Sequence, residues 1–391
     1  MNNKKDNYKD NYKDKYIALF LLHALGDTIG YNNALWEFNL LNDNDMGSSI
    51  NSILKATIEI ISDFVSRGGI SMIDLSGWNI SDDTLIGYEI ANFILDCNFD
   101  KNNVVEENDI NKLKKNIKKM LKQEQKNKIE RGFGLMTSNA ILSWTDTSDQ
   151  RHKPYNVNAG GNGCSMRTLP IGLRFYKDED IDKLINTSII SSMITHNSPI
   201  GYLAGLASAY FVKLAINKID ISIWPFLLIE LYESEKVKKY INKDDDNIFY
   251  DYRTTVRIWK KYVEMFFSDK KEKLHLKTSS NLIVRVKTMI ELNESIEYNM
   301  KNPTFMAGGN GPTSVIMAYD GLADCDGNWE KLMYYTMLHG GDSDTVGAIA
   351  GGLYGILYGY GNVPMRLLDN LEMKDKLIEI GEKIYENYYK I

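Results

Sequence analysis

The sequence has few cysteines and few prolines for its length. Only three cysteines and seven prolines occur in 391 residues. The cysteines, Cys97, Cys164 and Cys325, are too few and too scattered for a disulfide framework or a zinc site. A reduced compartment is the simpler interpretation of this composition, and a cytoplasmic location is therefore expected.

The sequence also lacks a long apolar run and an excess of positive charge. The two longest apolar stretches, residues 16–25 and 348–360, are too short or too rich in glycine to span a bilayer. Lysine and arginine total 46 against 52 acidic residues, which gives a formal net charge of −6. Neither a membrane nor nucleic acid is therefore an expected partner. The 43% of hydrophobic residues are enough to bury a core, which excludes wholesale disorder.

Alternating strand patterns with turn pairs are missing, and helical periodicity dominates. Residues 1–15 are polar and are expected to form a flexible tail. No linker interrupts residues 16–391, so we expect one all-α domain there. The lysine-rich segment 108–131 is predicted to be a surface helix with solvated charges rather than a binding patch. Helices are predicted at about 17–25, 50–65, 85–95, 108–131, 181–194, 200–216, 222–234, 250–267, 280–298, 312–323, 329–338, 344–358 and 365–388.

Two short acidic segments stand out, about 260 residues apart in the chain. They are Ser81-Asp82-Asp83-Thr84 and Gly340-Gly341-Asp342-Ser343-Asp344-Thr345, and each stands directly before an apolar helix. Helix capping alone explains either segment, because an acidic side chain suits the positive end of a helix dipole. However, adjacent aspartates exceed what a cap needs, and the glycine pair lets a backbone approach something closely.

If the two helix starts meet in space, four carboxylates and two hydroxyls converge. Like charges at that distance need compensation, which divalent cations supply. Oxygen ligands without a histidine or cysteine cluster favour Mg²⁺ or Mn²⁺ over zinc. The pattern therefore suggests a binuclear site, with metals roughly 3.5–4 Å apart as in other sites of this kind.

Two glycine-rich segments form a second candidate feature. The first is Gly160-Gly161-Asn162-Gly163, and the second is Gly308-Gly309-Asn310-Gly311. Backbone N–H groups at such helix entrances can hold phosphate oxygens. A plain glycine loop is the alternative explanation, and no Walker A pattern is present.

Together these motifs resemble the ADP-ribosylglycohydrolase family, in their order, their spacing and the helix after each, from about residue 16 to 384. The residues that carry the resemblance are Gly26-Asp27-Thr28-Ile29-Gly30, Ser81-Asp82-Asp83-Thr84, Gly161-Asn162-Gly163 with Met166-Arg167 and Pro170, and Gly341-Asp342-Ser343-Asp344-Thr345. Within the family the chain is most similar to the arginine-specific branch, ADP-ribosylarginine hydrolase. That similarity lies in Gly30-Tyr31-Asn32, Trp36-Glu37-Phe38, Gly77-Trp78, Met193-Ile194-Thr195-His196, Gly201-Tyr202-Leu203 and Ala318-Tyr319-Asp320.

The resemblance implies an orthogonal bundle of helices around two Mg²⁺ ions, for which Mn²⁺ can substitute. It implies that Glu37 lies on a mobile loop over the cleft. The implied metal ligands are Ser81, Asp82, Asp83, Asp342, Asp344 and Thr345, and the catalytic candidates are Asp82, Asp83, Asp342 and Glu37. The candidates for binding ADP-ribose are Gly160, Gly161, Asn162, Gly163, His196, Gly308, Gly309 and Gly311, with Phe305 or Tyr319 beneath the adenine.

The function implied is hydrolysis of the N-glycosidic bond between ADP-ribose and a protein arginine, which releases ADP-ribose and unmodified arginine. The expected partners are mono-ADP-ribosylated proteins, and the expected state is a monomer. One alternative is hydrolysis of ADP-ribosylserine or of an O-acyl-ADP-ribose ester. Another alternative is a non-catalytic relative that binds ADP-ribose or has a structural role. The sequence argues against it, because all four motif aspartates and both hydroxyl partners are intact.

Overall fold

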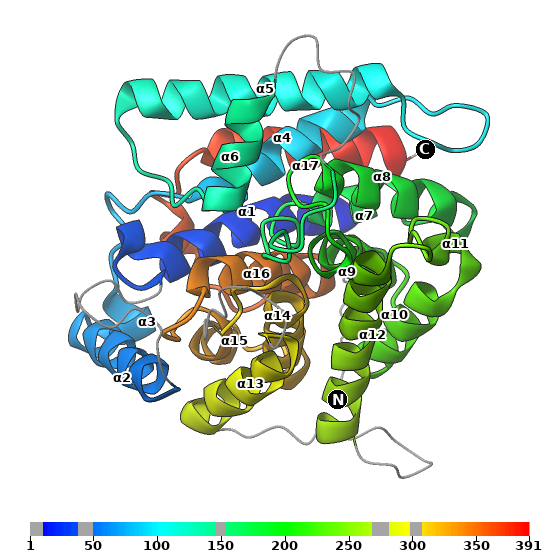
Figure 1. The fold of residues 1–391 in the computed structure, drawn as a ribbon. Helices are drawn as coiled ribbons and strands as arrows, with labels where there is room; N and C mark the ends of the chain where they lie inside the picture. Colours follow the sequence, from blue (N-terminus) through cyan, green and yellow to red (C-terminus); the bar gives the residue numbers. More distant parts are fainter. Residues whose placement is uncertain (1–10, 38–49, 145–153, 268–280, 298–306, 391) are drawn as a thin grey trace, which may run out of the picture.

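The computed structural model describes residues 11–37, 50–144, 154–267, 281–297 and 307–390. In these residues the secondary structure consists of helices, and the only β-pairings are two isolated bridges, Phe99 with Val105 and Gly161 with Asn310 (Figure 1). The predicted all-α fold class is therefore confirmed.

The helices of the described residues include the predicted ones, in the predicted order. They are α1 (Tyr12–Tyr31), α2 (Ile50–Ser66), α3 (Gly69–Met72), α4 (Asp82–Asp96), α5 (Glu107–Asn127), α6 (Leu135–Ser143), α7 (Leu169–Arg174), α8 (Ile181–Met193), α9 (Pro199–Ile216), α10 (Trp224–Glu233), α11 (Glu235–Lys238), α12 (Asp246–Phe266), α13 (Leu282–Glu297), α14 (Gly311–Asp324), α15 (Trp329–Thr336), α16 (Ser343–Tyr358) and α17 (Lys374–Tyr388). Helices α3, α6, α7 and α11 lie outside the predicted ranges. The helix expected at 365–388 is wrong in one respect. A 3₁₀ turn at Met365–Leu368 is separated from α17 by Met373, whose left-handed backbone interrupts a continuous helix.

The N-terminal boundary also differs from the prediction. Helix α1 begins at Tyr12, after Asn11, whose side chain accepts a hydrogen bond from the backbone N–H of Asp14. Residues 12–15, which were expected in the tail, are therefore helical. The ring of Tyr12 stacks on Tyr389, with 4.4 Å between the centroids, and this contact with the C-terminal helix favours the earlier start. Residues 1–10 lie outside the described part of the chain.

The centre of the fold is the close crossing of α1 and α16, which lie side by side in Figure 1. A Cβ atom on Gly26 would lie 2.1 Å from the carbonyl oxygen of Gly347, and one on Gly30 would lie 2.2 Å from that of Ser343. Any larger side chain would force the two backbones apart. Glycine at these positions therefore brings the last turns of α1 against the start of α16.

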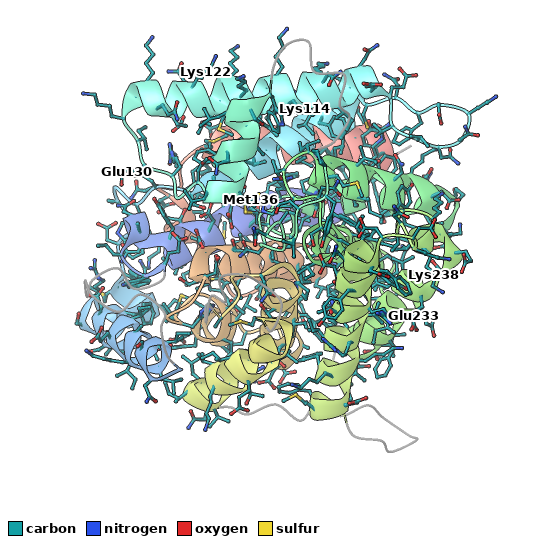
Figure 2. All side chains as sticks on the ribbon, in the orientation of Figure 1. Lys114, Lys122, Glu130, Met136, Glu233 and Lys238 are labelled. Carbon is teal, nitrogen blue, oxygen red and sulfur yellow. The ribbon has the colours of Figure 1, made fainter. Side chains whose placement is uncertain are left out.

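The lysine-rich helix α5 lies at the surface, as predicted. Its apolar residues Ile110, Leu113, Ile117 and Leu121 are buried against the body of the protein. Figure 2 shows Lys122 on the outer face of the helix, pointing away from the core. The periodicity therefore predicted which face of α5 is buried.

Helix α9 has a different character from α5, because it is apolar on all sides. Within the described residues it is the one helix that is long and apolar enough to cross a membrane. However, 94% of that stretch is buried inside the protein, among helices that include α7, α8 and α14. Burial in the core accounts for its composition.

Candidate active site

The two acidic motifs stand at the starts of α4 and α16, as the sequence predicted. Ser81 is the N-cap of α4, where its hydroxyl accepts a hydrogen bond from the backbone N–H of Asp83 at 3.2 Å. Asp342 occupies the N-cap position of α16. All six predicted metal ligands are buried, namely Ser81, Asp82, Asp83, Asp342, Asp344 and Thr345.

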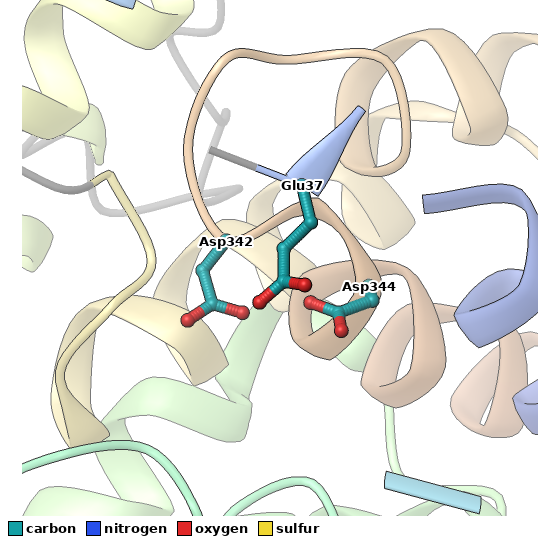
Figure 3. Close-up of side chains that lie close together, drawn as sticks. All are labelled: Glu37, Asp342 and Asp344. Atoms are coloured by element: carbon teal, nitrogen blue, oxygen red, sulfur yellow. The ribbon is translucent and has the colours of Figure 1, made fainter. Parts of the chain in front are cut away.

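Glu37 joins two of these aspartates in one cluster (Figure 3). One carboxylate oxygen each from Glu37, Asp342 and Asp344 lies within 4.8 Å of the other two. Glu37 was expected on a loop over the cleft, but its carboxylate is close enough to share a cation with the second motif. Residues 38–49, which continue the segment, lie outside the described part of the chain.

Trp36 explains how Glu37 is held in this position. The indole is fully buried, with its Nε1 donating to Asp63 at 2.9 Å, and it packs edge-on against Trp78 with 5.2 Å between the ring centroids. The ring of Trp36 therefore belongs to the core and offers no surface to a ligand. Its role is to anchor the chain beside Glu37.

Asp82 and Asp83 face the same concentration of negative charge. Burial raises the pKa of Asp82 to about 8, with further contributions from Asp27 and Asp342. Burial, and then Asp27 and Asp82, raise the pKa of Asp83 well above its usual range. Helices α4 and α16 pack against each other, as the hypothesis of converging carboxylates requires, and the mutual effects on these pKa values agree with it.

The donor set fits a hard divalent cation. Oδ2 of Asp83 is buried without a hydrogen-bond partner, which leaves an acceptor for a positive group. Among the described residues, the one group that could hold a metal consists of the three carboxylates of Glu37, Asp342 and Asp344. Oxygen ligands of this kind suit Mg²⁺ or Mn²⁺ better than zinc.

The buried carboxylates of the two acidic motifs predict how the stability of the metal-free protein depends on pH. Burial raises the pKa of Asp82 to about 8 and holds that of Asp344 above its usual range. The folded state therefore binds more protons than the unfolded chain between about pH 4 and about pH 8, and stability should fall as the pH rises through that window. Thermal denaturation in a chelator at several pH values measures this slope. Saturating Mg²⁺ should flatten it, and a metal-free protein that is more stable at the higher pH would contradict the prediction.

Asp27 is a site residue for which the sequence indicated no role. It lies fully buried on α1, and its carboxylate accepts hydrogen bonds from the backbone N–H groups of Ser81 at 3.0 Å and Thr84 at 3.1 Å. The hydroxyl of Thr84 donates to it as well. Asp27 thus fixes the first turn of α4 from the neighbouring helix. The sequence signal that could have identified Asp27 is its place between Gly26 and Gly30, because these glycines permit the close crossing of α1 with α16.

The two glycine-rich segments meet beside the carboxylates. Gly161 pairs with Asn310 in an isolated bridge, and the side chain of Asn162 donates to the carbonyl of Gly308 at 2.9 Å. Burial raises the pKa of Asp342, and the nearby side chains of Asp344 and Asn162 counteract that rise, so the two glycine-rich segments, which we call the glycine wall, lie beside the cluster. The structure therefore brings Gly160, Gly161, Asn162, Gly163, Gly308 and Gly309 to one region next to the acidic motifs.

Gly311 does not fit the predicted role in binding ADP-ribose. Its N–H already donates to the carbonyl of Gly160 at 3.0 Å, so it is not free for a phosphate oxygen. A Cβ atom at this position would lie 2.3 Å from the carbonyl oxygen of Ile200. Glycine is required here because α14 packs closely on α9.

His196 lies against the glycine wall, where the sequence placed it. Cβ atoms on Gly161 and Gly163 would lie 3.4 Å and 3.2 Å from its Nε2. Its Nδ1 is 2.8 Å from the hydroxyl of Thr195, which in turn accepts a hydrogen bond from the buried guanidinium of Arg167 at 2.8 Å. Burial and the Arg167 charge lower the pKa of His196 to about 3. His196 is therefore an uncharged imidazole that shares a hydrogen bond with the hydroxyl of Thr195 through Nδ1.

Neither candidate for the adenine platform is supported. Tyr319 is fully buried among Phe211, Trp224 and Tyr262, and its hydroxyl donates to the carbonyl of Ile221 at 2.8 Å. It is a core residue, and its proposed contact with adenine is wrong. Phe305 lies outside the described residues.

Comparisons with known proteins identify the family of this chain. The sequence model of the family described as ADP-ribosylglycohydrolase matches residues 8–390. The chain is 29% identical to ADP-ribosylhydrolase ARH1 of Dictyostelium discoideum over 384 residues, which cover 93% of this chain and 92% of that protein. It is 25% identical to ADP-ribosylhydrolase ARH3 of Danio rerio over 228 residues, or 58% of this chain and 57% of that protein.

A viral protein and a solved structure extend the comparison. A protein of Acanthamoeba polyphaga mimivirus, provisionally named ADP-ribosyl glycohydrolase L444, is 32% identical over 87% of this chain, and the match spans only 63% of that protein's length. A solved structure described as an ADP-ribosylglycohydrolase-related protein complex aligns with a TM-score of 0.55 at 18% identity, over 96% of this chain and 98% of the other, and so shares its fold. The chain therefore belongs to the ADP-ribosylglycohydrolase family, the hydrolases that cleave linkages to ADP-ribose.

Proposed function

We propose that this protein is a magnesium-dependent ADP-ribosylarginine hydrolase, which releases ADP-ribose and restores unmodified arginine on a protein. The observation that carries the proposal is the buried meeting of Glu37, Asp342 and Asp344 with the Asp82-Asp83 pair. A cap for a helix start needs no such concentration of charge. Ser81, Asp82, Asp83, Asp342, Asp344 and Thr345 would hold two Mg²⁺ ions, with Glu37 close to the second motif.

In the reaction, the bond between the anomeric carbon of ribose and the arginine nitrogen breaks, and a bond from that carbon to a water oxygen forms. Positive charge develops on the sugar as the bond breaks, and the carboxylates of the cluster stabilise it. One carboxylate accepts a proton from the attacking water, and this proton passes to the departing guanidine, which ends as a guanidinium. Bound Mg²⁺ would fix the ribose hydroxyls and lower the pKa of a nearby water.

The glycine wall and His196 supply the remaining contacts. Backbone N–H groups of the segment Gly160-Gly161-Asn162-Gly163 can donate to diphosphate oxygens. Asn162 is held between Gly308 and Asp342, which fixes this segment relative to the carboxylates. The uncharged His196 can donate to a ligand oxygen from Nε2 without repelling a cationic leaving group.

An arginine acceptor is favoured over serine on two grounds. The motif Trp36-Glu37-Phe38 and the pair Thr195-His196 resemble the arginine-specific branch. A guanidinium leaving group is also cationic, so the carboxylate of Glu37 suits it better than a neutral serine hydroxyl.

The acceptor prediction is tested with two matched peptides that carry ADP-ribose on arginine or on serine. We expect kcat/KM for the arginine peptide to exceed that for the serine peptide by at least about tenfold. This ratio corresponds to about 1.4 kcal/mol of differential transition-state stabilisation, which one well-placed charged contact can supply. An O-acyl-ADP-ribose ester, assayed beside them, tests the third linkage. Equal rates or a preference for serine would leave the hydrolase assignment in place and remove the arginine specificity.

A further inference from the structure

Arg131 is a buried cation outside the carboxylate cluster, four residues after the end of α5. Its side chain is only 2% exposed. The guanidinium donates from Nη1 and Nη2 to the two carboxylate oxygens of Glu372 at 2.7 Å each, and from Nε to Glu124 at 2.8 Å. A two-pronged pair of this kind fixes the orientation of the guanidinium, which a lysine cannot reproduce.

The same pair holds the chain that leads into α4. Arg131 donates from Nη1 to the carbonyl of Ile80 at 2.9 Å, and its own carbonyl accepts the N–H of Asp82 at 2.8 Å. Glu372 accepts the N–H of Ile80 at 3.2 Å. Three hydrogen bonds therefore fix the backbone on both sides of Ser81, at the point where Asp82 enters the cluster.

The turn after Arg131 also borders Glu37. Gly132 has a left-handed backbone with φ of 72°, and a Cβ atom on it would lie 3.4 Å from Oε2 of Glu37 and 3.2 Å from the ring of Tyr31. The segment that Arg131 anchors thus lies against two separate parts of the site, the start of α4 and the carboxylate of Glu37.

We propose that Arg131 and Glu372 form a positioning pair that fixes the start of α4 and the Gly132 turn, so that the carboxylates meet at cation-binding distance. Neither side chain belongs to the predicted ligand set. Arg131 and Glu372 act through the backbone of Ile80 and Asp82. The proposal rests on the proposed metal centre for its effect on Mg²⁺, but its effect on the backbone is independent of that centre.

Two measurements on the full-length protein test the pair. Hydrogen exchange followed by mass spectrometry reports on the N–H groups of Ile80 and Asp82 without any metal, and calorimetric titration reports Mg²⁺ affinity. Arg131→Lys should speed exchange in the peptide that covers residues 78–84 and weaken Mg²⁺ binding by about 10- to 100-fold, as loss of outer-shell support does elsewhere. Glu372→Gln keeps the size of its side chain and should show a smaller change in the same direction.

Arg366→Lys is the matched control. Arg366 also anchors a loop, by donating to the carbonyls of Ile73 and Ile70, but it makes no contact with residues 80–82. Unchanged exchange at residues 78–84 in both pair variants would overturn the proposal. An equal loss of Mg²⁺ affinity in Arg366→Lys would also overturn it, because the effect would then be general destabilisation. If the unaltered protein binds no Mg²⁺, the metal centre of the proposed function fails, and the exchange result still decides the role of the pair.

Discussion

Exhaustive removal of divalent metal should reduce turnover of ADP-ribosyl-arginine to the background rate, and added Mg²⁺ should restore it. The physical reason is that the buried carboxylates need cations to compensate their charge and to position the sugar. Free ADP-ribose is measured after treatment with chelator, with and without Mg²⁺ or Mn²⁺. We expect Mn²⁺ to substitute, because the donors are hard oxygen atoms.

Two controls accompany the chelation experiment. Zn²⁺ at the same concentration should restore less activity, since the site offers neither histidine nor cysteine ligands among its described residues. Circular dichroism before and after chelation shows whether the all-helical fold persists. Full turnover by a protein that is shown to be free of metal would contradict the binuclear centre.

Replacement of single carboxylates should produce the second large effect. Asp344→Asn and Asp82→Asn are each expected to lower kcat by about 1000-fold, which corresponds to about 4 kcal/mol of lost transition-state stabilisation. Glu37→Gln should lower kcat by about 100-fold and weaken Mg²⁺ binding less than Asp344→Asn does. We expect the smaller effect at Glu37 because of its position. Asp344 lies in the first turn of α16, whereas Glu37 lies in the segment that follows α1.

The matched control for these variants is Asp109→Asn. Asp109 also lies in the first turn of a helix, α5, where it accepts a hydrogen bond from the backbone N–H of Asn98 at 2.7 Å, but it is outside the cluster. Its replacement should cost a fraction of a kcal/mol to about 1 kcal/mol in stability and leave kcat unchanged. If all four variants lose activity equally and slightly, the acidic motifs are helix caps and the proposed centre is absent.

Much of the fold was predictable because helices leave a local record in the sequence. Apolar residues at helical spacing predicted α2, α4, α5, α9 and α16 close to their observed bounds. The points where helices end or are interrupted were harder to predict. The left-handed backbones of Lys128 and Met373 occur at residues with no special preference for that conformation. The start of α1 depended on the stacking of Tyr12 on Tyr389, a contact between the two ends of the chain.

The site, like the fold, has features that the sequence predicts and features that it does not. The position of the two acidic motifs at helix starts was predictable, since two carboxylates and a hydroxyl directly before an apolar helix form a local pattern. The roles of Trp36 and Tyr319 were not, because an aromatic side chain suits a ligand surface and a core equally well until its neighbours are known. Gly311 shows the same ambiguity, because glycine can expose its N–H to a phosphate or permit two helices to touch.

The sequence by itself determined most of the helices, the two acidic helix starts and the membership of the family, all of which depend on residue type and on spacing within short segments. Only the tertiary structure decided that Glu37 reaches the second motif, that Asp27 fixes the first turn of α4, and that Arg131 meets Glu372. Each of these contacts joins residues far apart in the chain. Glu37 reaches the second motif because the glycines of α1 and α16 let the two helices approach to backbone contact, which brings the end of α1 to the start of α16.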